Sequence, residues 1–256
     1  DIRRAFLALA NTSPAVENLF NFRFEAGDLK GHNFANLFIT ALELSTNDYE
    51  KTISEIKRIL NIEHEVLPAT LDRSELYATL ENGKTIKGET NIDVPKHSGD
   101  LRIKKVFLKP KAKAYPLALQ AVKKADVIVI GPGDLYSSLA QILLVEGMAE
   151  AIRKSKAKKI YVCNLMNKHG ETNGYSVRDF TDRIEGLIGG PVDRVIYNDK
   201  RISPARVRKY GESHPELLGP VPFDRADEKF VGVDVVKSSG EIIHDPKKLV
   251  REILSV

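Results

Sequence analysis

The sequence predicts an α/β fold with a mostly parallel sheet, helices on both faces and a small antiparallel ribbon insertion. Three patterns predict it. After residue 116, short apolar runs alternate with helical patterns, as in parallel βαβ units. Residues 66–109 instead contain closely spaced strand patterns around Asn82-Gly83, a strong hairpin signal. The first 60 residues have mostly helical spacing. We expect a single domain over residues 1–256, with the ribbon at about 66–109.

The elements of the N-terminal half follow from these patterns in order. Apolar spacings of three and four predict helices, and Asn11-Thr12-Ser13-Pro14 supplies N-cap candidates and a proline for a first turn. These helices are expected at 3–9, 15–24, 33–44 and 48–60. The strands of the ribbon are expected at 65–68, 76–80, 85–90 and 102–108.

The alternating part of the chain supplies the main sheet. Its strands are expected at 126–130, 159–165, 194–198 and 231–236, with a short strand at 242–243. Its helices are expected at 117–124, 136–144, 147–154, 176–187, 204–210 and 246–254. If the strands are parallel, the loops that follow them meet at one edge of the sheet, which is where ligands bind in such folds.

Composition argues against several classes of protein. Lys and Arg number 39 against 35 Asp and Glu, and this mild excess is spread along the chain, so nucleic acid is not an expected partner. Cys163 is the only cysteine, so no intrachain disulfide can form and a reducing compartment fits. No apolar run approaches the ~20 residues that span a bilayer, and no signal-peptide pattern is seen. We therefore expect a cytoplasmic protein without a membrane span.

The most informative segment is the loop Gly131-Pro132-Gly133-Asp134, which follows an all-apolar strand and precedes a polar helix start. Glycines let a backbone approach an anion, and the N–H groups of a helix start attract phosphate. Ser137 could add a hydroxyl donor. The alternative is a tight turn in which Asp134 or Ser137 only caps the helix. We expect this loop to bind a phosphorylated ligand, with a nucleotide as the leading candidate.

A second polar loop follows the next predicted strand, so it should lie beside the first. Asn164 could recognise a base, a sugar or an amide edge. Glu171, Thr172 and Tyr175 offer an acceptor, a hydroxyl and a ring for stacking. The alternative is a loop of turn-forming residues in which Thr172 only caps a turn.

Two further polar residues, Asn33 and Asn36, open the apolar helix expected at 33–44. Polar residues at the start of a buried helix often face a ligand, although Asn33 also suits a plain N-cap. The histidines lack the spacing of metal ligands, and no Gly-x-Ser-x-Gly motif is present. A metal site built from soft ligands and hydrolase chemistry of that type are therefore not expected.

Several segments together carry a resemblance to a known family. They include Gly131-Pro132-Gly133-Asp134-Leu135-Tyr136-Ser137-Ser138, Tyr161-Val162-Cys163-Asn164-Leu165-Met166, Gly170-Glu171-Thr172, Gly31-His32-Asn33-Phe34-Ala35-Asn36-Leu37 and His244-Asp245. Over nearly its whole length the chain resembles the 2-phospho-L-lactate transferases and gluconeogenesis factors, and it is most similar to the gluconeogenesis-factor branch. The resemblance implies that the family's first strand and glycine-rich phosphate loop precede Asp1, so we expect this chain to lack them.

The resemblance also implies a Rossmann-like sheet, with a nucleotide pocket at the strand ends, and a function. The gluconeogenesis-factor branch binds UDP-sugars such as UDP-N-acetylglucosamine and supports cell-wall synthesis and cell shape during gluconeogenic growth, as a regulatory protein rather than an enzyme. The partner would then be a UDP-sugar or another nucleoside-diphosphate ligand, and a homo-oligomer is left open. Gly131, Gly133 and Ser137 would contact the diphosphate, Asn164 and Thr172 the sugar or base, and Tyr210 with His244 would close the pocket.

The other branch of the family implies an enzyme instead. It transfers a phospho-acyl group from a nucleoside-diphosphate-linked donor with the help of a divalent metal, so Mg²⁺ would be a cofactor. Asp1, and with it Asp134, would hold the metal, and Asp1→Asn should abolish turnover with a modest loss of nucleotide affinity. The residues alone leave this alternative open.

Overall fold

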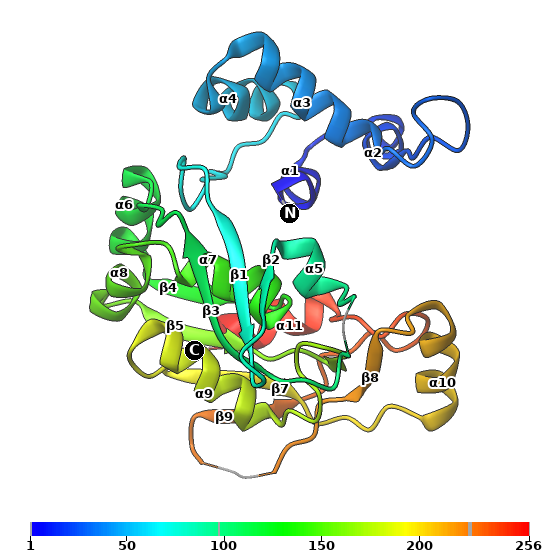
Figure 1. Cartoon of the computed structure of the whole chain (residues 1–256), viewed down its shortest axis with the longest axis vertical. Coiled ribbons are helices and arrows are strands. Elements are labelled where there is room, and N and C mark those ends of the chain that lie inside the picture. Colours follow the sequence, from blue (N-terminus) through cyan, green and yellow to red (C-terminus); the bar gives the residue numbers. More distant parts are fainter. Residues whose placement is uncertain (1, 97, 225–226, 256) are drawn as a thin grey trace. The chain divides into compact units, whose positions relative to one another are not determined.

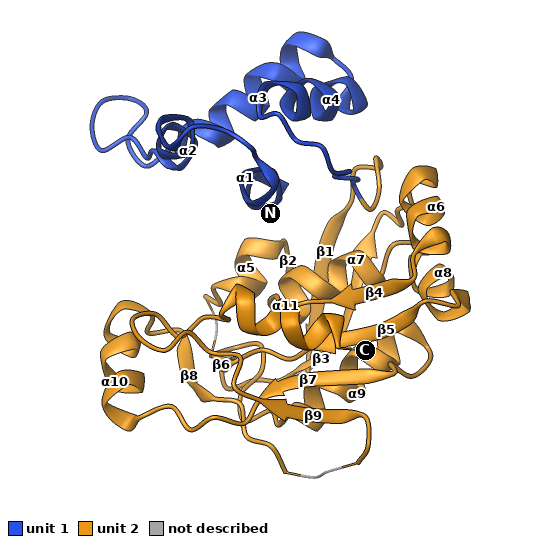
Figure 2. Cartoon of the chain, turned by 180° about the vertical axis from the view of Figure 1, so that it is seen from behind, with its two compact units in different colours: residues 1–68 blue, residues 69–256 orange. Residues whose placement is uncertain are grey.

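The computed structural model describes residues 2–96, 98–224 and 227–255 (Figure 1). The chain forms two compact units, residues 1–68 and residues 69–256, which Figure 2 shows in blue and orange. The single-domain organisation expected from the sequence stays a prediction. Among the described residues, none of the helices combines the length and apolar character needed to cross a bilayer.

The first unit is helical, as predicted. Its helices are α1 (Ile2–Leu9), α2 (Pro14–Asn21), α3 (Phe34–Thr46) and α4 (Tyr49–Ile59). Phe6, Phe20 and Ile56 lie at the centre of its core. The expected strand at 65–68 does not form, because no described segment pairs with it. α3 is also less enclosed than its apolar sequence indicated, since Ala35 is its one fully buried residue.

The main sheet of the second unit is fully parallel, which confirms the predicted fold class. It consists of β4 (Val127–Ile130), β5 (Lys158–Val162), β7 (Arg194–Asn198) and β9 (Phe230–Val233), in the order β4-β5-β7-β9. Helix α9 (Val177–Ile188) covers one face and α11 (Pro246–Leu254) the other, as the two opposite views show (Figures 1 and 2). The α11 side chains pack on a core that includes residues of β5 and β7.

The antiparallel ribbon is a separate sheet. It contains β1 (Glu75–Leu80), β2 (Thr85–Lys87) and β3 (Ile103–Lys109) in the order β2-β1-β3. The hairpin signal at Asn82-Gly83 is confirmed, because β1 and β2 pair across it. The strand expected at 85–90 ends early, at Lys87. Gly88 turns the chain there with a φ of 90°, and the short helix α5 (Glu89–Asp93) follows.

The remaining helical elements connect the strands of the second unit. They are α6 (Pro116–Lys124), the π-helical turn η1 (Leu135–Ala140), α7 (Gln141–Leu143), α8 (Met148–Lys154) and α10 (Pro204–Ser213). The expected strands at 159–165 and 231–236 are shorter than predicted and end at Val162 and Val233. In place of the strand at 242–243 there is an isolated bridge between Val236 and His244.

The second unit also contains a small two-stranded sheet that is separate from the main sheet. It pairs β6 (Met166–Lys168) with β8 (Leu217–Pro220) in antiparallel orientation. The sequence pattern indicated only a loop over 164–175, because a three-residue strand carries no recognisable periodicity. This sheet holds the second polar loop close to the first.

Candidate functional site

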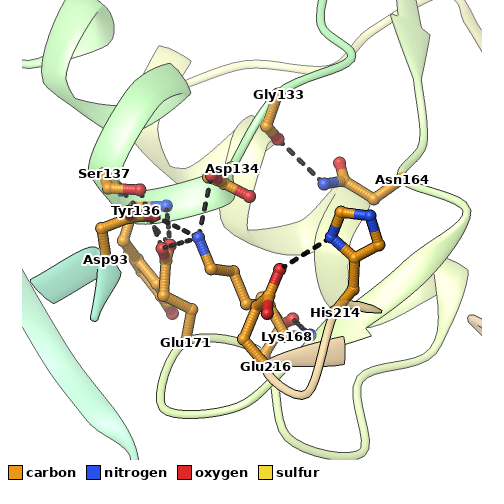
Figure 3. A network of polar contacts seen from close by, with 11 residues as sticks. Asp93, Gly133, Asp134, Tyr136, Ser137, Asn164, Lys168, Glu171, His214 and Glu216 are labelled. Carbon is orange, nitrogen blue, oxygen red and sulfur yellow. Dashed lines mark hydrogen bonds and ion pairs between the residues drawn. The ribbon is translucent and has the colours of Figure 1, made fainter. Parts of the chain in front are cut away.

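The loop after β4 packs tightly against the end of β5. Gly131 has a φ of 79°, and a Cβ atom placed there would lie 3.0 Å from the carbonyl oxygen of Val162. Both the backbone conformation and the close approach therefore require glycine. Asn164, just after β5, donates from Nδ2 to the Gly133 carbonyl at 2.9 Å (Figure 3). The two loops thus lie side by side, as the predicted parallel order implied.

Gly131→Ala is expected to lower the free energy of unfolding by about 3 kcal/mol, because it adds a steric clash to a left-handed backbone. Gly174→Ala is a matched control, since Gly174 also has a positive φ but nothing within 4 Å of its added Cβ. That variant should lose only about 1 kcal/mol. Urea denaturation of both variants measures the difference, and equal losses would show that the contact with Val162 is unimportant.

The start of η1 is bound by an internal carboxylate. Glu171 is buried and accepts hydrogen bonds from the backbone N–H groups of Tyr136 at 2.9 Å and Ser137 at 3.3 Å. It also accepts from the Ser137 hydroxyl at 2.8 Å (Figure 3). Burial, followed by the charge of Asp134, raises the pKa of Glu171. These are the donors that a phosphate at the helix start would use, so a phosphate there would have to displace Glu171.

Lys168 lies at the centre of a cluster of three carboxylates. Its ammonium group bonds to Asp93, to Asp134 at 3.0 Å and, less closely, to Glu171 at 3.8 Å. Burial opposes the charge on Lys168, but the hydrogen bond to Asp93 and the other two carboxylates outweigh it and raise the pKa of Lys168. Oxygen atoms of the three carboxylates lie within 4.8 Å of one another.

Carboxylate clusters of this kind suit Mg²⁺, the metal implied by the transferase alternative. In this cluster, however, the position between the carboxylates is taken by the Lys168 ammonium group, which already bonds to Asp93 and Asp134. The donor set therefore does not fit a metal while Lys168 is in place. Asp1, the other expected metal ligand, lies outside the described residues.

A cavity of about 370 Å³ opens at the carboxyl ends of β5 and β7. The polar and aromatic residues that line it are Asn164, Tyr197, Asn198, Asp199, Lys200, Arg201 and Phe223. The rings of Tyr197 and Phe223 stack with their centroids 4.2 Å apart. The Oδ1 atoms of Asn164 and Asn198 are buried and accept no hydrogen bond from any described residue. Unpaired buried acceptors are costly, so these two favour a ligand or water that donates to them.

The other predicted site residues lie in several parts of the fold. Thr172 and Tyr175 belong to the network after β5: the Thr172 hydroxyl accepts from the Lys168 N–H, and the Tyr175 hydroxyl pairs with that of Tyr136. Tyr210 lies on α10 and packs against the core around Ile160 and Ile242. Pro132 forms part of the loop after β4, where its peptide bond with Gly131 is cis.

His244 lies in the bridge with Val236, and Asn33 and Asn36 lie at the start of α3 in the first unit. Burial lowers the pKa of His244 to about 4, and its buried Nε2 has no hydrogen-bond partner among the described residues. Asn33 caps α3, accepting from the Asn36 N–H at 3.4 Å and donating to the Phe22 carbonyl. Its capping role is therefore present, while a ligand role for Asn33 or Asn36 stays a prediction.

Comparison with known proteins identifies the family. A model of the family described as 2-phospho-L-lactate transferase CofD matches residues 1–239. The chain belongs to this CofD family. A gluconeogenesis factor from Halalkalibacterium halodurans is 40% identical over 239 residues, which cover 92% of this chain and 72% of that relative. The family membership expected from the sequence motifs is confirmed.

Two further comparisons give the share of each chain that matches. A crystal structure of a Bacillus halodurans protein, 37% identical, matches with a TM-score of 0.91 over 99% of this chain and 82% of that chain. A relative from Nostoc sp. is 38% identical over 99% of this chain. This chain spans only 57% of the length of that relative.

Most of the residues around the larger cavity of this CofD-family chain were missed from the sequence. The rule that pointed to Asn164 also applies to β7, whose end leads into Asn198 and Lys200, so those two could have been found. Phe223 follows β8, a strand that the sequence pattern did not predict. Its stacking on Tyr197 depends on long-range packing, and no local signal marks it.

Proposed function

We propose that this chain is a cytoplasmic regulatory protein that binds a nucleoside-diphosphate sugar of the UDP-N-acetylglucosamine type and supports cell-wall synthesis and cell shape under gluconeogenic growth. Membership of the CofD family and the similarity to gluconeogenesis factors support the general class. The observation that carries the proposal is the cavity at the ends of β5 and β7.

The lining of that cavity suits the parts of such a ligand. Its volume of about 370 Å³ lies within the usual range for small-molecule sites. The stacked pair Tyr197 and Phe223 offers an aromatic surface for a base or sugar ring. The unpaired amide oxygens of Asn164 and Asn198 can accept from ring N–H or hydroxyl groups. Each part of the lining therefore favours recognition of a polar ring.

The chemistry of nearby side chains favours binding over covalent catalysis. Burial raises the pKa of the Cys163 thiol to about 12, so it is protonated at neutral pH and a poor nucleophile. His244 is neutral there because burial lowers its pKa to about 4. Glu171 already accepts three hydrogen bonds from its neighbours. These three groups are held in structural environments rather than prepared for reaction.

Isothermal titration calorimetry tests the proposal, with UDP-N-acetylglucosamine, UDP-glucose and GDP, each with and without Mg²⁺. We expect a UDP-sugar to bind with micromolar Kd and with no requirement for Mg²⁺. Phe223→Ala should weaken binding about tenfold, because it removes half of the stacked surface. Phe107→Ala removes half of a comparable stacked pair in the ribbon, Tyr77 and Phe107, and should leave Kd unchanged.

The other outcomes of that titration separate the alternatives. Preference for GDP with Mg²⁺, together with turnover of a phospho-acyl donor, would favour the transferase alternative. If none of the three nucleotides binds, the proposed ligand class is rejected. If Phe107→Ala weakened binding as much as Phe223→Ala does, the cavity would not be the binding site.

A further inference from the structure

A second, smaller cavity adjoins the first and is strongly basic. It has a volume of about 210 Å³ and lies between the start of α10 and the segment that follows β9. Its lining consists of Lys200, Arg201, Ile202, Ser203, Arg206, Val236, Lys237 and Ser238. Lys200, Arg201 and Ile202 also line the larger cavity, so the two cavities share one wall. A single ligand could therefore extend from one cavity into the other.

The smaller cavity carries a surplus of positive charge. Four of its lining residues are cationic, and none of the described residues that line it is acidic. Lys200 bonds to Asp234 at 2.7 Å, but Asp234 is shared with Lys248 at 2.9 Å, so one carboxylate faces two ammonium groups. Hydrogen bonds from these two lysines lower the pKa of Asp234 to about 2. Neutralisation of Lys200 is thus only partial.

Two of the cations have no partner, and a third is held in place. Arg201 and Lys237 form no side-chain hydrogen bond or ion pair with any described residue. Arg206 donates from Nε to the Gly240 carbonyl at 3.0 Å and from Nη2 to the Glu241 carbonyl at 2.7 Å. These bonds fix the plane of its guanidinium group before any ligand arrives. Fixed and unpaired cations together are what an anion site requires.

The loop after β4 lies beside an excess of negative charge. Its helix-start donors are bound to Glu171, and three carboxylates are balanced there by the single cation Lys168. A diphosphate placed at that loop would add negative charge to a cluster that is already negative. In the basic cavity the same group would meet Arg201 and Lys237, two cations that have no side-chain partner among the described residues. Coulomb energy therefore favours the basic cavity.

We infer that the smaller cavity binds the diphosphate of the ligand through Arg201, Arg206 and Lys237, while the nucleoside or sugar occupies the larger cavity. This inference rests on the proposed function, and it relocates the phosphate contacts from the glycine loop to the start of α10. The chemical class recognised is a nucleoside diphosphate or its sugar ester. The hydroxyl groups of Ser203 and Ser238 lie in the same wall as further donors.

The double variant Arg201→Ala/Lys237→Ala tests the inference on the full chain. Calorimetry should show a loss of about 50-fold in affinity for UDP-N-acetylglucosamine and a weaker dependence of Kd on salt. Binding of uridine, which has no phosphate, should not change. The matched control is Arg208→Ala/Lys209→Ala, which removes the same charge from exposed positions of α10 outside the cavity. Its Kd should remain within twofold of the wild type.

Inorganic pyrophosphate separates failure of this inference from failure of the proposed function. If the wild type binds the UDP-sugar and the cavity variant binds it equally well, the inference is wrong and the proposed function stands. If the wild type binds pyrophosphate through Arg201 and Lys237 but binds no nucleotide, the anion site stands and the proposed function fails. If both double variants lose affinity equally, net charge explains the effect and the inference is rejected.

Discussion

Glu171→Ala is expected to lower the free energy of unfolding by about 4 kcal/mol. The substitution leaves the buried N–H groups of Tyr136 and Ser137 without an acceptor, and it opens space where the carboxylate was. It also removes one of the three negative charges around Lys168. Urea denaturation followed by circular dichroism measures the change. Because the loop after β4 depends on η1, this should be the most damaging change in the network.

Two further variants make that measurement specific. Glu171→Gln keeps an oxygen acceptor of nearly the same shape, so it should recover about half of the lost stability. Glu150→Ala removes an exposed carboxylate that pairs with Lys154, and it should change stability by less than about 0.5 kcal/mol. An equal, small effect of Glu171→Ala and Glu150→Ala would mean that the Glu171 network does not support the fold.

Lys168→Met should destabilise the protein by about 3 kcal/mol at neutral pH. The variant leaves Asp93, Asp134 and Glu171 together without their shared cation, and the repulsion between these carboxylates is poorly screened because Lys168 and Glu171 are largely buried. Lys154→Met, which breaks an exposed pair, is the matched control and should have almost no effect. Similar unfolding midpoints for the two variants would contradict this account of the cluster.

The loss of stability caused by Lys168→Met should depend on pH. Burial already raises the pKa of Glu171 above its ordinary value, and loss of Lys168 should raise this pKa further. A raised carboxyl pKa means that the folded state binds protons more tightly than the unfolded state. The stability that protonation of Glu171 gives to the folded state is therefore fully present below about pH 4.5. It is lost as the pH rises through the pKa of Glu171 in the folded state. Unfolding curves should show a smaller deficit at about pH 5 than at about pH 7.

Lys168→Met should also create a response to divalent cations. With the ammonium group removed, three carboxylates within 4.8 Å become a set of oxygen donors without a bound cation. Millimolar Mg²⁺ should then raise the Tm of the variant and leave that of the wild type unchanged. If Mg²⁺ stabilised the wild type as strongly as the variant, Lys168 would not be the cation that fills the cluster.

Local sequence patterns predicted much of the fold and part of the site. Helical spacing, the Asn82-Gly83 turn and the alternation after residue 116 each depend on neighbours in the chain, and the structure confirms most of the elements that they predict, the strands at 65–68 and 242–243 excepted. The importance of Gly131 also had a local signal in the sequence, because this glycine comes directly after an apolar strand. The meeting of that loop with Asn164 followed from the parallel order of consecutive strands.

The contacts that decide the chemistry of the site were not predictable in the same way. Glu171 and Asp134 were both expected to face a ligand, but Glu171 closes the start of η1 and Asp134 pairs with Lys168. Lys168 also pairs with Asp93, which is 75 residues away from it along the chain. Such contacts depend on how β6 and the ribbon pack, and neither packing has a sequence period.

The sequence by itself therefore determined the fold class, the family and the edge of the sheet at which to look for a ligand. Tertiary structure alone decided which side chains at that edge are free. The donors at the start of η1 are satisfied by Glu171, while Arg201 and Lys237, which line the smaller cavity, have no side-chain partner in the part of the chain that the structure describes. The hydrogen bonds that decide this, such as those of Ser137 with Glu171 and of Lys168 with Asp93, join residues distant in the chain, so the availability of a polar group is a property of the folded structure.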